Sequence, residues 1–128
     1  MYHIFISHAW KYDSDYSTIV SWLKNSSLSY SNYSVPYHDP LDANNIKKLK
    51  TALTNQIRPS NIVIVIAGMY DAYSDWIKYE IDEAVSMGKT IIGIKPWGHQ
   101  RVPEVVTKNA TEMVNWNSKS LIDAIKRH

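Results

Sequence analysis

Residues Ile62-Val63-Ile64-Val65-Ile66-Ala67 form an uninterrupted apolar run, and this run decides the fold. It is too short for a helix and dense in β-branched side chains, a pattern typical of a parallel strand buried on both faces. A similar run, Thr90-Ile91-Ile92-Gly93-Ile94, follows after one helical segment. The two runs therefore predict two central strands of a parallel sheet.

Strand-like and helix-like segments alternate along the rest of the chain. The expected strands are 2–7, 33–37 and 112–116, with a polar loop at 25–32 and a loop at 95–103. The expected helix caps are Asp13 or Ser14, Asp42, and Asn117 or Ser118, while Pro59 and Gly88 end two helices. The alternation predicts an α/β fold, a single domain over residues 1–128 with a five-stranded parallel sheet and helices on both faces. The switch point of this doubly wound sheet is expected beside the first strand.

Composition narrows the class of protein. A chain of 128 residues with 45% hydrophobic content and no cysteine fits one globular domain without disulfides. No apolar run approaches the roughly 20 residues of a membrane span, and the first residues enter a strand pattern, so a cytoplasmic protein without a signal peptide is expected. The net charge is +2 and the five histidines are scattered, so neither nucleic-acid binding nor a metal site is expected.

Glu80 is the leading candidate for a functional residue. At about 100° per residue, Ile77, Ile81, Ala84 and Val85 form one apolar stripe, which places Glu80 beside it, at the border between core and solvent. Ligands of open α/β sheets bind at the carboxyl ends of the strands, where this helix begins. Geometry leaves two interpretations open: a carboxylate that performs chemistry, or a first-turn Glu favoured by the helix dipole.

Several enzyme classes lack their motifs here. No Gly-x-Gly-x-x-Gly follows the first strand, and neither a phosphate loop nor a Gly-x-Ser-x-Gly elbow occurs. Polar and aromatic residues instead follow the expected strands, and the fold should gather them in one crevice. The residues of this group are Ser7, His8, Trp10, Tyr37, His38, Asp39, Tyr70, Tyr73, Ser74, Trp76, Trp97 and His99.

Three motifs together resemble a known family: Phe5-Ile6-Ser7-His8, Tyr37-His38-Asp39-Pro40 and Trp76-x-x-x-Glu80. They are similar to TIR domains, which have a flavodoxin-like fold, and specifically to the small bacterial TIR-like proteins of Thoeris anti-phage defence systems. The resemblance implies that Glu80 is the catalytic glutamate that cleaves NAD. It also implies a substrate-binding set of Phe5, Ser7, His8, Asp39, Ser74 and Trp76. The loop at 37–41 lacks the family's Arg-Asp-x-x-Pro-Gly pattern, which weakens the case for loop-mediated assembly.

The resemblance implies an NAD-consuming enzyme that needs no cofactor, because NAD is its substrate. Cleavage of the nicotinamide–ribose bond would yield an ADP-ribose-derived, cyclic nucleotide that signals to an effector protein. A phage-derived trigger and a homo-oligomer are the other expected partners. Two alternatives stay open: a non-catalytic TIR-like adaptor, and an N-glycosidase or ribosyltransferase that acts on another nucleotide.

Overall fold

Five parallel strands form one sheet in the order β2-β1-β3-β4-β5 in the computed structural model. The structure describes residues 1–7, 13–34, 46–67, 74–96 and 102–128. Because the chain adds β2 on one side of β1 and β3 on the other, the switch point lies between β1 and β3. The strands are β1 (Tyr2–Ser7), β2 (Tyr30–Asn32), β3 (Ile62–Ile66), β4 (Thr90–Ile94) and β5 (Glu112–Val114).

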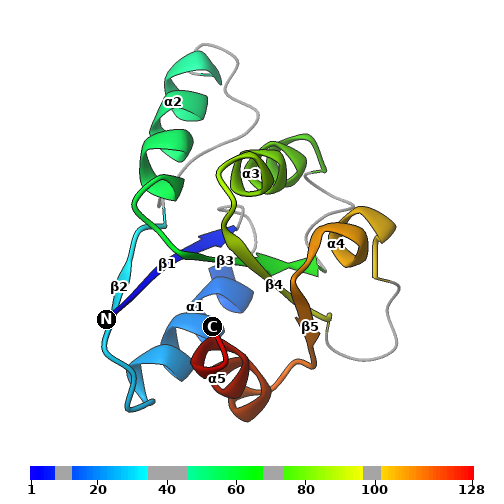
Figure 1. Cartoon of the computed structure of the whole chain (residues 1–128). Helices are drawn as coiled ribbons and strands as arrows, with labels where there is room; N and C mark the ends of the chain where they lie inside the picture. Colours follow the sequence, from blue (N-terminus) through cyan, green and yellow to red (C-terminus); the bar gives the residue numbers. More distant parts are fainter. Residues whose placement is uncertain (8–12, 35–45, 68–73, 97–101) are drawn as a thin grey trace.

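Helices cover both faces of this sheet, which confirms the predicted α/β class. Figure 1 shows helices on both faces of the sheet, gathered separately on each face. The first pair is α1 (Asp13–Lys24) and α5 (Ser118–Lys126), which contact each other. The second group is α2 (Ile46–Ile57), α3 (Ser74–Ser86) and α4 (Glu104–Asn109), with α3 in contact with both neighbours.

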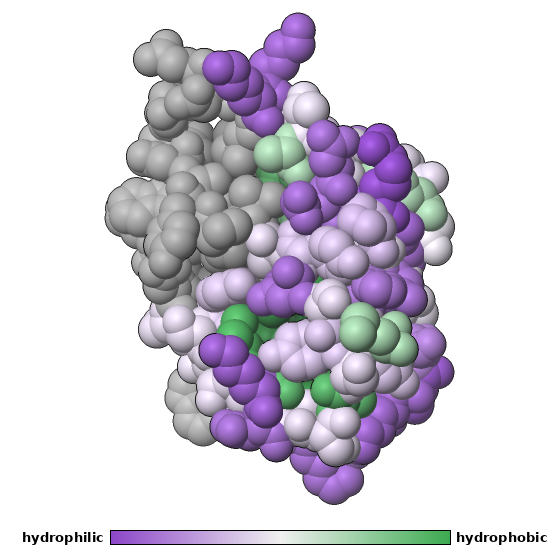
Figure 2. Space-filling view, turned by 90° about the vertical axis from the view of Figure 1, so that its left-hand side faces the viewer, coloured by the Kyte–Doolittle hydropathy of each residue, from purple (hydrophilic) through white to green (hydrophobic). Residues whose placement is uncertain are grey.

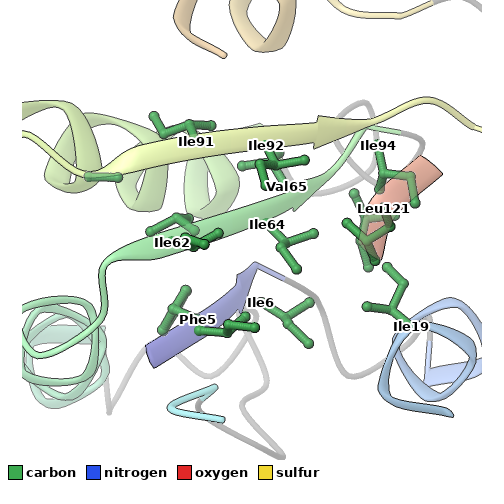
Figure 3. Packing of buried hydrophobic residues seen from close by; sticks show 14 of the residues in the cluster. Phe5, Ile6, Ile19, Ile62, Ile64, Val65, Ile91, Ile92, Ile94 and Leu121 are labelled. Carbon is green, nitrogen blue, oxygen red and sulfur yellow. The ribbon is translucent and has the colours of Figure 1, made fainter. Parts of the chain in front are cut away.

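Strand register divides the buried side chains between the two faces. Ile6 pairs with Ile64, and Ser7 pairs with Val65. Successive residues of a strand point to opposite faces, so Ile6 and Ile64 share one face and Ser7 and Val65 share the other. Figure 3 shows the first face, where Ile6, Ile64 and Ile94 approach Ile19 of α1 and Leu121 of α5. The second face is therefore the one covered by α2, α3 and α4.

The central strand β3 behaves as its sequence predicts. All five of its residues are buried, and Phe5 of the neighbouring β1 is only 1% exposed within the same core. Packing explains why residue 93 of β4 is a glycine. An added Cβ at Gly93 would collide with the Met113 side chain and would lie 3.1 Å from the Val106 side chain of α4. The second face is thus tightly packed over β4.

Two elements differ from the prediction. The second strand was expected at 33–37, of which 35–37 lie outside the described residues, whereas β2 is Tyr30–Asn32, within the segment expected to be a loop. It pairs with β1 from Tyr2↔Tyr30 onward, and Tyr33 N donates to Ile4 O at 2.7 Å just beyond it. As an edge strand it is polar and only partly buried, so hydrophobicity did not reveal it. Figure 2 shows this edge of the molecule, where the described residues are mainly hydrophilic with small hydrophobic areas.

The short helix α4 was not predicted, because its six residues carry one buried side chain, Val106.

Two helix signals are confirmed: the Asn117 side chain caps α5 by accepting from Ser120 N at 2.8 Å, and Gly88 follows α3 with φ of 68°. Residue Asp42, the predicted cap of α2, lies outside the described residues. Every helix in the described part of the chain is too short or too polar to span a membrane.

Candidate active site

Ser7 and Glu80 bring two polar side chains together beside the switch point. Ser7 is the last residue of β1, on the face covered by α2, α3 and α4. Glu80 lies in the middle of α3, the helix that follows the neighbouring strand β3. The two side chains meet between sheet and helix, so a carboxylate lies close to the carboxyl end of β1. This is the region in which doubly wound sheets bind their ligands.

The rotation of α3 buries Glu80 instead of an available apolar side chain. At about 100° per residue, Glu80 and Val85 lie on opposite flanks of the stripe formed by Ile77, Ile81 and Ala84. The structure leaves Glu80 only 1% exposed and Val85 49% exposed. The predicted position of Glu80 at the border of the core is therefore wrong, as is the predicted burial of Val85. A helix that buries a carboxylate and exposes a valine departs from the hydrophobic pattern, and such departures occur at functional sites.

The buried polar atoms of this pair have no hydrogen-bond partner. Both carboxylate oxygens of Glu80 and the Ser7 hydroxyl are inaccessible, and none has a partner among the described residues. Ser60, another buried polar residue, is different because its hydroxyl donates to Ile57 O at 2.6 Å. Buried polar groups are nearly always paired, and unpaired ones call for an explanation such as a catalytic role. Within the described residues, no side chain or backbone group supplies a partner for the Ser7 hydroxyl or for either carboxylate oxygen of Glu80.

Burial changes the acidity of Glu80. Removal from water raises the pKa of Glu80 to about 8, because the charged carboxylate loses its hydration. The Ser7 hydroxyl lies near enough to lower this pKa in part, although no hydrogen bond of regular geometry joins the two side chains. A carboxyl group with a pKa near neutrality can change its charge state under physiological conditions, as catalytic acids and bases do.

Ser7→Ala is expected to leave the free energy of unfolding unchanged to within about 1 kcal/mol, because the buried hydroxyl has no hydrogen-bond partner among the described residues. Ser60→Ala is the matched control: it removes an equally buried hydroxyl that is hydrogen-bonded and should cost about 0.5–1.5 kcal/mol. Denaturant unfolding of both variants measures the difference. Equal destabilisation by the two substitutions would show that Ser7 has a structural partner after all.

The other predicted site residues fall into two groups. The Phe5 side chain belongs to the hydrophobic core and is as buried as Glu80, at 1% exposure, and its contact with substrate stays a prediction. His8 and Asp39 lie outside the described residues. Ser74 and Trp76 lie in the first turn of α3, but their side chains are outside the described part of the structure. Their roles, like those of Ser7 and Glu80, stay predictions.

Two further observations complete the site description. Within the described ranges, no group of three or more His, Asp or Glu side chains is placed to hold a metal ion. The sequence gives no indication of a hydrogen-bond network that joins α2 and α3 through Thr54, Tyr79 and Glu83. Single polar residues at helical spacing carry no signal that such a network exists.

Fold and site together define a doubly wound α/β domain with a buried carboxylate beside its switch point, and this carboxylate has no partner in the described part of the chain. The chain belongs to the family of the Thoeris protein ThsB, TIR-like domain, whose family model matches residues 5–101. This match runs from Phe5, within β1, to beyond the end of β4, and it includes Ser7 and Glu80.

A solved structure of the Clostridium botulinum CMP N-glycosidase BcmB is also similar. It superposes with a TM-score of 0.62 at 13% sequence identity, covering 98% of this chain and 99% of that chain. At this identity the likeness establishes the shared fold. No curated protein matches the chain in sequence.

Proposed function

We propose that this chain is a glycosidase-type enzyme that cleaves the bond between nicotinamide and ribose in NAD. The observation that carries the proposal is Glu80, a buried carboxylate beside the switch point that has no hydrogen-bond partner among the described residues. Membership in the Thoeris TIR-like family supports NAD as the substrate. Ser7 is proposed to contact the substrate beside Glu80.

The chemistry requires one carboxylate. Nicotinamide leaves NAD as a neutral molecule because it starts as a cation, so its departure needs no proton donor. Positive charge then develops on the ribose, and an ionised Glu80 stabilises it electrostatically. Water as the acceptor gives ADP-ribose and a proton, whereas attack by an adenine nitrogen of the same molecule gives a cyclic product. In both cases the bond from ribose to nicotinamide breaks and one new bond to the same carbon forms.

Activity towards NAD is expected to rise with pH. Because burial raises the pKa of Glu80 to about 8, the ionised form is the minority form in the free protein at pH 7. The kcat/KM should therefore increase roughly tenfold per pH unit below about pH 8 and level off above it. The measurement is nicotinamide release over a range of pH in a buffer of constant ionic strength. A profile that is flat between pH 6 and pH 9 would contradict the role of an ionised Glu80.

A second candidate function is cleavage of a nucleotide that carries a neutral base. The fold shared with a CMP N-glycosidase favours it. A neutral base such as cytosine is a poor leaving group unless it gains a proton, and a protonated Glu80 could supply one. The pH dependence would then have the opposite sign, with activity falling as the pH rises through about 8.

One experiment separates these reactions from a non-catalytic adaptor role. The purified chain is incubated in parallel with NAD and with CMP, with and without lysate of phage-infected cells, and the products are identified by mass spectrometry. Free nicotinamide that requires Glu80 supports the first proposal, and free cytosine supports the second. Absence of turnover under all conditions favours an adaptor that works by domain contacts.

The biological setting is proposed from the family. The product is proposed to be a nucleotide signal for an effector protein, made in the cytoplasm after a phage-derived trigger. A second copy of the chain is proposed to complete the active site. Specific activity that stays constant where the protein is strictly monomeric would exclude this assembly.

A further inference from the structure

A groove of about 470 Å³ lies between α2 and α3, apart from the Ser7–Glu80 pair. Three cationic side chains line it, Lys47, Lys50 and Arg58, together with the polar residues Thr51, Thr54 and Asn55. Figure 1 shows the two helices side by side, and their contacts confirm this. We call this surface the cationic groove.

The α2 side of the groove carries positive charge without compensation from its own helix. The sequence of α2 contains three lysines and no acidic residue. Among the described residues, Lys47, Lys50 and Arg58 have no ion-pair partner, whereas Lys78, Lys119 and Arg127 each pair with a carboxylate. Lys89 adds a further cation beside this region, since its Nζ donates to Arg58 O at 2.8 Å. The cationic groove is therefore electrostatically complementary to an anionic partner.

Hydrogen bonds hold the two walls of the groove together. The Tyr79 hydroxyl is 2.7 Å from Thr54 Oγ1 and donates to Lys50 O at 3.3 Å. Thr54 Oγ1 donates to Glu83 Oε2 at 3.2 Å, so the carboxylate on the α3 side is already engaged. Lys50 Nζ lies 5.3 Å above the Tyr79 ring. The groove is thus formed before any partner binds, which lowers the entropic cost of binding.

The spacing of the charges distinguishes between kinds of anion. A line of side chains runs along one face of α2, because its members follow one another at intervals of three or four residues. These residues are Lys47, Lys50, Thr54 and Arg58. Lys47 and Arg58, the residue that follows α2, are eleven positions apart, which at the helical rise per residue corresponds to roughly 16 Å. A phosphate group needs cations that converge on one point, whereas this line matches carboxylates repeated along a peptide. The Tyr79 ring, already covered by Lys50, is not a free platform for a nucleotide base.

We propose that the cationic groove is a docking surface for an acidic segment of a protein partner. The segment would lie along α2 with its carboxylates facing Lys47, Lys50 and Arg58. Neighbouring residues of α3 face different ways, with Tyr79 towards this groove and Glu80 towards β1. The docked partner would therefore contact the helix that carries the buried carboxylate. The proposal stands on the groove alone and does not depend on the proposed function.

The test uses the full chain and a fluorescein-labelled peptide of about twelve residues, with Glu at every third or fourth position and Ala elsewhere. Fluorescence anisotropy measures its Kd. The groove variant Lys50→Glu/Arg58→Glu is compared with the control variant Lys48→Glu/Lys108→Glu, which has the same net charge and alters exposed lysines outside the groove. Circular dichroism verifies that both variants are folded.

The groove variant is expected to weaken peptide binding at least about tenfold, and the control less than about twofold. If the two variants weaken binding equally, the interaction depends only on net charge and the proposal is overturned. Absence of binding by the wild-type chain would also overturn it. Inorganic tripolyphosphate is the competitor. If it displaces the labelled peptide at lower concentration than the unlabelled peptide does, the groove is a phosphate site and the proposal fails.

Discussion

Glu80→Gln is expected to lower NAD cleavage by a factor of about one hundred or more while the protein stays folded. Glutamine has nearly the same shape but cannot carry the negative charge that is proposed to stabilise the ribose cation. The side chain is buried and has no hydrogen-bond partner among the described residues, so the exchange breaks no contact that holds α3 in place. Loss of activity would therefore report on charge and not on folding. Nicotinamide release followed by mass spectrometry is the measurement.

Glu104→Gln provides the matched control, because Glu104 is an exposed carboxylate in the first turn of α4. It should change the rate of NAD cleavage by less than about twofold, since surface substitutions away from a site have small effects. Full activity of a folded Glu80→Gln protein would remove the catalytic assignment of Glu80. Equal loss in both variants would instead indicate a general effect of charge on the enzyme.

The central part of the fold could be predicted from sequence because its signals are local and strong. β3 is a run of β-branched residues, all of them buried. The alternation of strands and helices then leaves few ways to connect a parallel sheet. The edge strand β2 has no such signal, because Tyr30, Ser31 and Asn32 are held by pairing with β1 and not by burial. Only the position of β1 reveals which polar segment becomes the edge.

The sequence singles out Glu80 as a candidate residue but does not give the geometry around it. A helical projection locates Glu80 beside an apolar stripe, and the family resemblance selects it as the catalytic residue. The degree of burial depends on how α3 rotates over the sheet, which is a tertiary property. A small side chain at Ser7 leaves room on this face for the Glu80 side chain, whereas Val85 on the opposite flank faces outward. Sequence periodicity cannot decide which flank of a stripe turns inward.

The free energy of unfolding of the wild-type protein is expected to fall, as the pH rises, below that of the Glu80→Gln variant. The pKa of Glu80 in the folded protein is about 8, above the ordinary value of 4.5, so between these values the folded state holds a proton that the unfolded state has released. The free energy of unfolding should then decrease by up to about 1.4 kcal/mol per pH unit in this window.

The contribution of protonated Glu80 to the free energy of unfolding is fully present below about pH 4.5 and is lost as the pH rises through about 8. Its total is on the order of 4–5 kcal/mol, a large fraction of the stability of a small domain. Denaturant unfolding of wild-type and Glu80→Gln proteins between pH 5 and pH 9 measures it, because all other titrating groups cancel in the difference. The free energy of unfolding of the Glu80→Gln variant should increase relative to that of the wild type as the pH rises towards about 8. A difference that does not change with pH would mean that Glu80 is ionised in the folded protein, and the expected rise of activity towards pH 8 would disappear with it.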